Sequence, residues 1–421
     1  MHEDLVVIGL GYVGLPVVKE AINSGLNVVG LDLNQKIVDN LNAGQSHIDD
    51  ISDDEISEMI KKGFTATSDI SCLADTSNIV ICVPTPLSKE GLPDLTAVKG
   101  AVKAIADHVQ PGTLVSLEST TYPGTTEEIV VPILEESGHK IGKDIFVVFS
   151  PERIDPGNPK YGLKNTTKIV GGVNEKSTQK GVELYSQFID NVYPVSGTKE
   201  AELTKLLENT YRHINIALVN EMAKFCHDLD INIWDVIQAA STKPFGFQPF
   251  FPGAGVGGHC IPIDPNYLSH AVKAKLGYPF RFVELAQEIN DSMPEYVASR
   301  IQNLLKADGL PLKNSKVLLV GVTYKPNIAD QRESPALPLA NILLKKEVKI
   351  SYFDPYVEKW NVNEDYSLKG ESNLQDACEK ADIVVLLQKH DQVDEAILLD
   401  HSKQVFDTTG KLKETKNVTQ L

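Results

Sequence analysis

Gly9-Leu-Gly11-Tyr-Val-Gly14 decides the fold of the first part of the chain. It overlaps the end of the apolar run 5–10, which is typical of a buried strand, and precedes a helix predicted over Pro16–Ser24. A second strand is predicted over Leu26–Leu31, so the chain opens as a β-α-β unit. In such a unit the first glycine permits a tight turn, the second lets backbone N–H groups approach a pyrophosphate, and the third permits close helix–strand packing.

The residue that ends the second strand indicates which dinucleotide is bound. Asp32 stands 18 residues after Gly14, where a carboxylate accepts hydrogen bonds from the adenosine ribose and repels a 2′-phosphate. NAD is therefore predicted over NADP, although the same glycines also suit a turn in a sheet that binds nothing. The predicted cofactor residues of this turn are Gly9, Gly11, Tyr12, Val13, Gly14 and Asp32.

The later apolar runs divide the chain. Short runs over Ser77–Val83, Thr113–Leu117 and Ile145–Phe149 extend a doubly wound parallel sheet to about residue 190. A long helix follows over Lys199–Leu229, with Thr198 as its N-cap. After Asn314 a second alternating unit begins, without the glycine turn. We predict an α/β protein with two Rossmann-like domains joined by a long central helix and a small helical domain, at residues 1–190, 198–305 and 314–421.

The long helix has two apolar flanks. One follows the 3.6-residue period and is predicted to face the chain's own core: Leu203, Leu206, Leu207, Ile214, Leu218, Met222 and Phe225. The other is predicted to bury a second subunit in a homodimer, or else packs within the same chain: Ile216, Val219, Ala223 and Cys226.

Charge and composition exclude several classes of protein. The 40 Lys+Arg and 57 Asp+Glu residues give a net charge of −17, which argues against a general grip on nucleic acid or an anionic membrane. The first apolar run is broken by glycines and Pro16, so it predicts neither a signal peptide nor a membrane span. The five cysteines form no CxxC pair, which is typical of free thiols in the cytoplasm.

One cysteine stands in an unusual context. Pro252-Gly-Ala-Gly-Val-Gly-Gly-His259-Cys260-Ile-Pro-Ile-Asp264 describes a flexible backbone that closes on a ligand and presents one thiol, which helix-end N–H groups would make nucleophilic. A metal site from His259, Cys260 and Asp264 lacks a suitably spaced fourth ligand, so no metal is predicted. The other four cysteines are interpreted as inert core residues.

Polar residues follow other predicted strands. The loops Val83–Pro86 and Ser119–Gly124 are expected to border the nicotinamide, although proline-rich turns also commonly just connect secondary-structure elements. In Ser150-Pro-Glu152-Arg153, the carboxylate is either a general base for water or an ion-pair partner of Arg153. Lys205 and Asn209 share one helix face, where they either hold an oxyanion or are simply solvated.

Together these motifs resemble, in order and over nearly the whole chain, the UDP-glucose/GDP-mannose dehydrogenase family of UDP-sugar 6-dehydrogenases. The later motifs are Gly257-Gly-His-Cys260 with Asp264, Gly321-Val-Thr-Tyr-Lys325 and Asp330-Gln-Arg332-Glu-Ser-Pro335. The resemblance implies a four-electron oxidation of the sugar C6 alcohol by two NAD molecules through a thiohemiacetal and a thioester on Cys260. It assigns catalysis to Cys260, Lys205, Asn209, Asp264, Glu152 and Thr120.

The resemblance also assigns binding residues. The further cofactor residues are Pro84, Thr85, Thr120 and Arg332, and the third domain with Lys325 is expected to close over the UDP moiety. The substrate residues are Glu152, Arg153, Lys205, Asn209, Phe250, Gly253, Gly257 and Lys325.

The segment Ser241–Gly253 bears on the sugar. Its sequence resembles that of the family branch that oxidises UDP-N-acetylglucosamine. An apolar wall of phenylalanines and prolines would accommodate an acetamido methyl group, although the same residues could instead belong to the core. UDP-N-acetylmannosamine and UDP-glucose stay open, and the family's arginine from a neighbouring subunit has no clear counterpart except the weak substitute Lys243. Two other readings also remain, a one-step hydroxyacid or 6-phosphogluconate-type dehydrogenase and a non-catalytic NAD-binding redox sensor.

Overall fold

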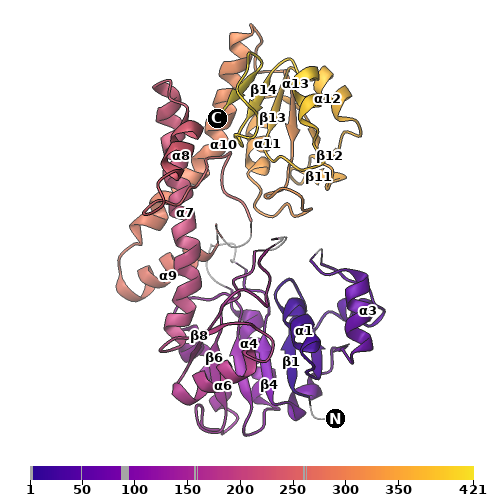
Figure 1. Cartoon of the computed structure of the whole chain (residues 1–421), viewed down its shortest axis with the longest axis vertical. Coiled ribbons are helices and arrows are strands. Elements are labelled where there is room, and N and C mark those ends of the chain that lie inside the picture. Colours follow the sequence, from indigo (N-terminus) through magenta and orange to yellow (C-terminus); the bar gives the residue numbers. More distant parts are fainter. Residues whose placement is uncertain are drawn as a thin grey trace. The chain divides into compact units, whose positions relative to one another are not determined.

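Two compact units make up the chain (Figure 1). The computed structural model describes residues 3–48, 50–86, 94–155, 158, 160–258, 261 and 263–421. Unit 1 comprises Met1–Glu208 and Asn266–Gly277, and unit 2 comprises Asn209–Pro265 and Tyr278–Leu421. The three domain ranges drawn from the sequence stay a prediction.

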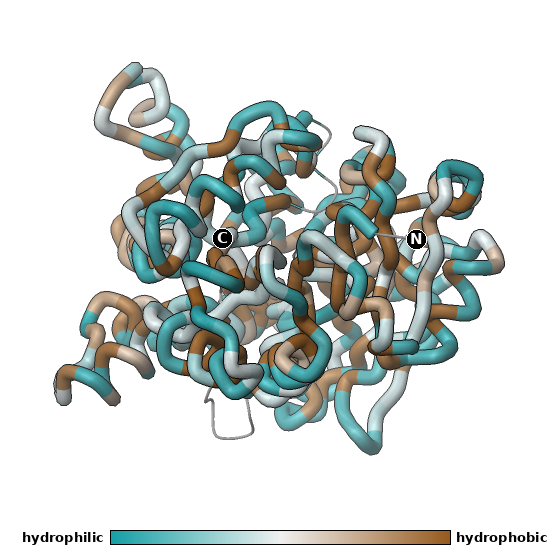
Figure 2. Tube along the Cα trace, turned by 90° about the horizontal axis from the view of Figure 1, so that it is seen from below, coloured by the Kyte–Doolittle hydropathy of each residue, from teal (hydrophilic) through white to brown (hydrophobic). Residues whose placement is uncertain are grey.

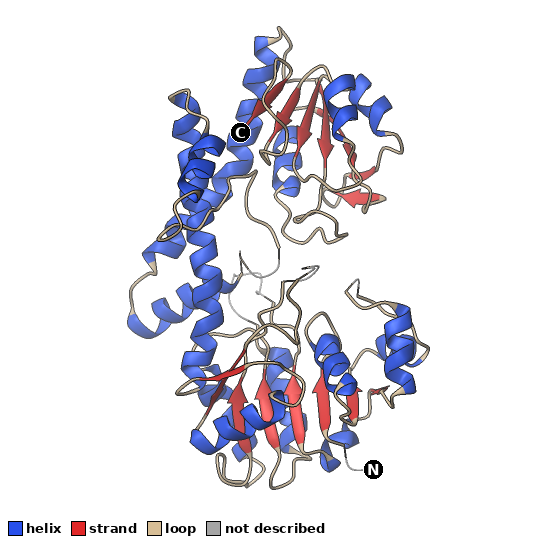
Figure 3. Cartoon of the chain, viewed as in Figure 1, coloured by secondary structure: helices blue, strands red, loops and turns tan. Residues whose placement is uncertain are grey.

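Unit 1 contains an eight-stranded sheet in the order β3-β2-β1-β4-β5-β6-β7-β8 (Figure 3). Its strands are β1 Leu5–Ile8, β2 Val28–Leu31, β3 Thr65–Thr67, β4 Asn78–Ile81, β5 Leu114–Leu117, β6 Phe146–Phe149, β7 Lys168–Gly172 and β8 Val192–Pro194. The prediction of a parallel sheet is confirmed up to β6, but β7 runs antiparallel to it. Parallel neighbours need a crossover that is usually helical, and the described residues between β6 and β7 contain no helix.

Helices cover both faces of this sheet because consecutive strand residues point to opposite sides. In β1, Leu5 and Val7 pack into one core, and Val6 and Ile8 pack into another. The first core includes residues of α1 Gly14–Asn23, α2 Gln35–Asn42, α3 Asp53–Lys61 and α6 Glu175–Tyr185, and the second includes residues of α4 Thr96–Ala106 and α5 Val131–Glu135. A 3₁₀ turn at Ile70–Asp75 and a π turn at Thr126–Val130 complete the unit.

Unit 2 contains a second parallel sheet, in the order β10-β9-β13-β14-β15. Its elements are β9 Lys316–Val320, α11 Ala336–Lys345, β10 Lys349–Phe353, α12 Leu374–Lys380, β13 Ile383–Leu386, α13 Glu395–His401, β14 Val405–Asp407 and β15 Val418–Gln420, with a hairpin of β11 Lys359–Asn361 and β12 Ser367–Lys369. Here too, Val317 and Leu318 face separate cores. The predicted second α/β domain is confirmed. Figure 2 shows hydrophobic and hydrophilic residues alternating at short intervals along the chain, as expected for helices and strands with one buried side.

The helices outside the sheets are α7 Thr198–Asp228, α8 Ile233–Ser241, α9 Asp264–Leu276 and α10 Arg281–Ala307. The predicted extent of α7 is confirmed to within one residue. None of the helices among the described residues combines the length and apolar character needed to cross a bilayer.

The prediction of which α7 flank is buried in the chain is mostly wrong. Val219, Ala223 and Cys226, expected to meet a second subunit, lie in the core of unit 2. Four residues of the other flank are instead 43–63 % exposed: Leu203, Leu207, Leu218 and Phe225. Both flanks are apolar, so periodicity locates them without distinguishing which one meets the core.

Candidate active site

Four parallel strands of unit 1 end at the motifs that the sequence singled out. β1 leads into Gly9, β4 into Val83–Pro86, β5 into Ser119–Thr120 and β6 into Ser150–Arg153. Because these strands are neighbours and run in one direction, their carboxyl ends share one edge, which is where ligands bind in open α/β sheets. Ser119 Oγ donates to the carbonyl oxygen of Val83 at 2.7 Å and so joins two of the loops.

The glycine turn is shaped as predicted. Gly9 has φ +90°, and a Cβ added there would lie 2.7 Å from the carbonyl oxygen of Cys82. A Cβ on Gly14, the first residue of α1, would lie 1.9 Å from the carbonyl oxygen of Gly9. A Cβ on Gly11 would meet nothing within 4 Å, so this position is open to a ligand. Among the described residues no side chain caps α1; the N–H of Leu15 donates to the carbonyl oxygen of Gly11 at 3.1 Å, and Pro16 has no N–H. The positive end of the helix dipole at Gly14 is therefore what would favour a pyrophosphate here.

Asp32 is held beside this turn. Its Oδ2 accepts from the N–H of Leu10 at 2.9 Å, and its Oδ1 accepts from the N–H of Asn34 at 2.9 Å. A carboxylate has about four lone-pair sites, so both oxygens can still accept hydrogen bonds from a ribose diol. The residues therefore fit NAD.

We expect the protein to bind and use NADP at least about 100-fold less efficiently than NAD, because a phosphate beside Asp32 places like charges together at a cost of a few kcal/mol. Asp32→Asn should reduce the ratio of kcat/KM for NAD to kcat/KM for NADP. Asp39→Asn, on the exposed surface of α2, should leave this ratio unchanged. Comparable turnover of the unmodified protein with the two cofactors would overturn the assignment.

Three of the predicted catalytic residues meet in unit 1. Lys205, on α7, is only 8 % exposed. Its Nζ donates to Thr120 Oγ1 at 2.6 Å and lies 3.8 Å from Glu152 Oε2. Glu152 is also 8 % exposed and accepts a hydrogen bond from the N–H of Ile154. The interpretation of Lys205 as part of a solvated helix face is therefore wrong, and the cluster joins an ammonium, a hydroxyl and a carboxylate.

Arg153 turns away from Glu152. Its Nη2 and Nε donate to the two oxygens of Glu208 at 2.6 and 3.1 Å, and its Nη1 donates to the carbonyl oxygen of Thr167. The alternative in which Glu152 is the ion-pair partner of Arg153 is thus not found. Glu152 keeps its place beside Lys205, where it is free of the guanidinium.

Asn209 and Asp264 form a second pair, within unit 2. Asn209 Nδ2 donates to Asp264 Oδ2 at 2.6 Å, and Asp264 is 2 % exposed. Asn209 stands four residues after Lys205 on α7, so the two side chains leave the same helix face one turn apart.

The predicted substrate residues of unit 2 lie on three segments. The N–H of Gly253 donates to Asn220 Oδ1 at 2.9 Å, and the ring of Phe250 stands edge-on to Tyr211. Lys325 lies between β9 and α11, as does Arg332, which was predicted to bind the cofactor and pairs with Asp330 at 2.6 Å. Cys260 and His259 lie outside the described residues, so the role of the thiol stays a prediction.

Two buried groups next to the cluster escaped the sequence analysis. Glu202, 1 % exposed on α7, accepts from the N–H groups of Gly124 and Thr126 at 2.5 and 2.8 Å and from Thr126 Oγ1 at 2.7 Å. It thereby fastens the loop that follows Thr120 to the helix turn before Lys205. Tyr267 similarly donates its hydroxyl hydrogen to the carbonyl oxygen of Thr85. The only signal for Glu202 was its spacing of three residues from Lys205.

Glu202 predicts a pH dependence of stability. Burial raises its pKa from 4.5 to about 7, against the opposing hydrogen bonds from Gly124 and Thr126. Between these values the folded state binds a proton that the unfolded state lacks, so this stabilisation is complete below pH 4.5 and is lost as the pH rises through 7. Between pH 4.5 and about 7, the free energy of unfolding of the unmodified protein should fall by up to about 3 kcal/mol relative to that of the Glu202→Gln protein. Thermal unfolding of both from pH 4.5 to 8 measures it, and a constant difference in Tm would contradict it.

The four described cysteines are unsuited to nucleophilic chemistry. Cys82, Cys226 and Cys378 are buried, and burial raises the pKa of each thiol. Burial also raises the pKa of Cys72, to about 11. All four are therefore neutral thiols near pH 7, in agreement with their interpretation as inert residues.

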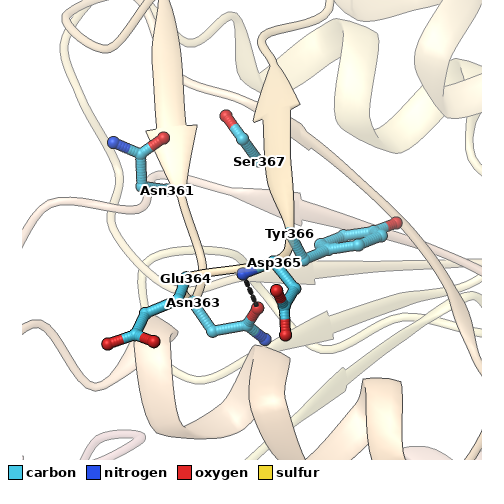
Figure 4. Close-up of a pocket in the computed structure, with 6 residues that line it drawn as sticks. All are labelled: Asn361, Asn363, Glu364, Asp365, Tyr366 and Ser367. Atoms are coloured by element: carbon cyan, nitrogen blue, oxygen red, sulfur yellow. Dashed lines mark hydrogen bonds between the residues drawn. The ribbon is translucent and has the colours of Figure 1, made fainter.

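A surface depression at the β11–β12 hairpin does not belong to the site (Figure 4). Figure 4 shows it lined by residues of the hairpin and its turn, and the hydrogen bond drawn there runs from the N–H of Asp365 to Asn363 Oδ1 and closes the turn. It contains none of the residues predicted to carry chemistry.

Comparison with known proteins agrees with this geometry. Three models of the UDP-glucose/GDP-mannose dehydrogenase family match: the NAD binding domain at residues 3–189, the central domain at 199–292 and the UDP binding domain at 318–414. A UDP-N-acetyl-D-mannosamine dehydrogenase of Methanococcus maripaludis is 35 % identical over 98 % of this chain and 93 % of its own. A UDP-N-acetyl-D-glucosamine 6-dehydrogenase of Salmonella typhi is 36 % identical over 91 % and 89 %. The solved structure of UDP-D-ManNAc dehydrogenase from Pyrococcus horikoshii superposes with a TM-score of 0.89 at 31 % identity, covering 99 % of this chain and 98 % of that one.

Proposed function

Because the chain belongs to the UDP-glucose/GDP-mannose dehydrogenase family of NAD-dependent oxidoreductases, we propose that it oxidises the C6 alcohol of UDP-N-acetylglucosamine to the carboxylate. The observation that carries the chemistry is the buried Lys205–Thr120–Glu152 cluster, which supplies a cation, a hydroxyl and a carboxylate at the carboxyl edge of the NAD-binding sheet. Bound NAD supplies the hydride acceptor, and two NAD molecules are reduced for each sugar.

Each residue has a defined part in the proposed reaction. Removal of the first hydride and the hydroxyl proton leaves an aldehyde at C6, and the Cys260 thiolate adds to its carbon to give a thiohemiacetal. Loss of the second hydride and the hydroxyl proton leaves a thioester. Water then attacks the thioester carbon and expels the thiolate, which yields the carboxylate and restores Cys260.

The polar groups of α7 serve these steps. Lys205 and Asn209 stabilise the negative charge that develops on the C6 oxygen, and Asp264, which holds Asn209, takes part in moving its proton. Glu152 serves as general base for the hydrolytic water. Because it is buried, it can act on that water without competition from bulk solvent.

Two observations support UDP-N-acetylglucosamine as the substrate. The apolar segment 241–253 resembles the branch that acts on UDP-N-acetylglucosamine, and a relative of that name is 36 % identical. UDP-N-acetylmannosamine, the epimer at C2, is the second candidate, because the relative from Methanococcus maripaludis and the structure from Pyrococcus horikoshii bear that name.

Substrate oxidation tests the proposal directly. UDP-N-acetylglucosamine, UDP-N-acetylmannosamine and UDP-glucose are each supplied with excess NAD, and NADH is counted per sugar consumed. We expect two NADH per UDP-N-acetylglucosamine and a kcat/KM at least about tenfold above the other two, the effect of about 1.4 kcal/mol in a pocket. If UDP-N-acetylmannosamine is the preferred substrate, it replaces UDP-N-acetylglucosamine in the proposal. Release of one NADH per sugar would rule out the four-electron oxidation.

We also propose that the chain forms a homodimer through α7, with the exposed stripe at the interface. This stripe consists of Leu203, Leu207, Tyr211, Leu218, Phe225 and Leu229. The first five fall within one side of α7, and Leu229 follows directly after the end of the helix. Each side chain is 43–65 % exposed, so a second copy could bury apolar surface there.

Paired Leu207→Lys and Leu218→Lys substitutions should therefore dissociate the dimer. Each leucine is worth about 1.5–3 kcal/mol when buried, and a twofold interface loses each one twice. Sedimentation velocity should show the unmodified protein as a dimer and the double variant as a monomer. Arg212→Glu, on the same helix outside the stripe, is the control and should stay dimeric. An unchanged sedimentation coefficient in the double variant would reject this interface.

A further inference from the structure

The segment between β9 and α11 has an unusual backbone. It carries Lys325 and Arg332, and two of its non-glycine residues, Asn327 and Glu333, have φ values of +65° and +51°. Such conformations are uncommon for residues with a Cβ, less so for Asn than for Glu, and contacts with the surroundings stabilise them. Its shape must therefore be maintained by contacts with the rest of unit 2.

His390 supplies one of these contacts from the loop after β13, the parallel neighbour of β9. It follows β13 and is fully buried. Its Nδ1 lies 2.9 Å from the backbone nitrogen of Asn327, and its Nε2 lies 3.1 Å from Asp354 Oδ2. A backbone N–H can only donate, so Nδ1 accepts, and Nε2 must carry the proton that is donated to Asp354.

The neighbours of His390 hold the same segment. Asn327 Nδ2 donates to Asp391 Oδ2 at 2.9 Å, and the N–H of Asp391 donates to Asn327 Oδ1 at 2.8 Å. Gln388 Nε2 donates to the carbonyl oxygen of Tyr324 at 3.1 Å. The residues after β13 thus fix the backbone on both sides of Lys325.

The other side of the segment supports the glycine loop. The Tyr324 ring lies over Gly258, where an added Cβ would come within 2.9 Å of its Cε2. A Cβ on Gly257 would lie 2.7 Å from Tyr324 Cβ and 2.8 Å from the carbonyl oxygen of Glu333. The N–H of Gly258 donates to the carbonyl oxygen of Arg332 at 3.2 Å. One segment therefore carries Lys325 and also backs the two glycines that stand just before Cys260 in the sequence.

We propose that His390 is a positioning residue for the UDP-sugar: its Nδ1 holds Asn327 in the left-handed conformation that gives the Lys325 segment its binding shape. The inference rests on the proposed function, in which Lys325 meets the diphosphate. His390 itself touches no substrate, because it is fully buried among Asp354, Asn327 and the ring of Tyr356, which lies 5.1 Å away and is tilted by 42°.

Two substitutions separate the two nitrogens of His390. The amide oxygen of Asn occupies roughly the place of Nδ1, so His390→Asn keeps an acceptor for Asn327. The amide nitrogen of Gln occupies roughly the place of Nε2, so His390→Gln keeps the donor to Asp354 and leaves the N–H of Asn327 without its acceptor. His401, a partly exposed histidine that pairs with Glu379 in the same unit, gives the control His401→Asn.

Titration calorimetry with UDP and steady-state kinetics on the full chain test the proposal. We expect His390→Gln to raise the Kd for UDP and the KM for the UDP-sugar at least about tenfold. The effect of His390→Asn should be smaller. In both variants the KM for NAD should rise less than the KM for the UDP-sugar, because the glycine turn and Asp32 lie in unit 1 and only Arg332, of the predicted cofactor residues, lies on this segment.

Each other outcome is decisive. A folded His390→Gln protein that binds UDP normally, or one whose KM for NAD rises by the same factor, overturns the proposal in favour of simple packing. If His390→Gln does not fold, Gln388→Met, which removes only the bond to Tyr324, must raise the Kd for UDP or the proposal fails. Absence of UDP binding by the unmodified protein defeats the proposed function instead.

Discussion

Cys260→Ala should abolish the oxidation of the UDP-sugar, with kcat for NADH release lowered by at least about 10³-fold, as when a covalent nucleophile is removed. Without the thiol, the aldehyde at C6 cannot be held as a thiohemiacetal, and the second hydride transfer has no attached substrate. The four other cysteines cannot replace it, since burial keeps them neutral and, in three cases, enclosed. NADH release from UDP-N-acetylglucosamine measures the loss, and Cys226→Ala is the matched control.

Further variants separate the competing mechanisms. Cys260→Ser should form an oxygen ester that hydrolyses slowly, and mass spectrometry of the protein should detect it. Glu152→Gln should slow breakdown of the acyl intermediate in a single turnover while NAD binding is unchanged. A one-step hydroxyacid or 6-phosphogluconate-type dehydrogenase needs no thiol and yields one NADH. A redox sensor would keep its function in Cys260→Ala, so full activity of that variant would reject the covalent mechanism.

Lys205→Met should lower kcat by about 10²–10³-fold, the typical effect of removing one preorganised donor from a developing oxyanion. The ammonium is held rigidly, because its Nζ donates to Thr120 at 2.6 Å and Glu152 lies 3.8 Å away. Little reorganisation is then needed when charge develops on the C6 oxygen. Methionine preserves length and apolar packing, so the substitution removes mainly the charge and its donors. Steady-state kinetics with NAD and the UDP-sugar provide the measurement.

The control for Lys205→Met stands six residues earlier on the same helix. Lys199 is 53 % exposed and pairs with Glu127, so Lys199→Met should leave kcat within about twofold, as expected for an exposed ion pair. Thermal unfolding of both variants establishes that they are folded. A kcat of Lys205→Met close to that of Lys199→Met would show that the buried ammonium does not stabilise the transition state.

Interactions of short range in the chain were readable from the sequence. The turn Gly9–Gly14 was predicted because φ +90° at Gly9 and the contact of Gly14 with Gly9 depend on local backbone geometry. The extent of α7 followed, to within one residue, from its 3.6-residue apolar period, although Thr198, predicted to precede the helix as its cap, is its first residue. The sequence does not predict the hydrogen bond between Asn209 and Asp264, since 55 residues separate them. The family resemblance only assigns both residues to catalysis.

Three features were decided by tertiary structure alone. They are the side of α7 that is covered, the burial of Glu202 and Lys205, and the hydrogen bond between His390 and Asn327. Each depends on partners far away in the sequence, 85 residues for Lys205 and Thr120 and 63 for His390 and Asn327. The sequence by itself determined the two sheets, the NAD turn and the isolated thiol motif, because periodicity, glycine conformations and spacing act within a few residues. Burial and ion pairing arise only when packing removes a group from water and brings a distant partner to it, and no local pattern encodes that choice.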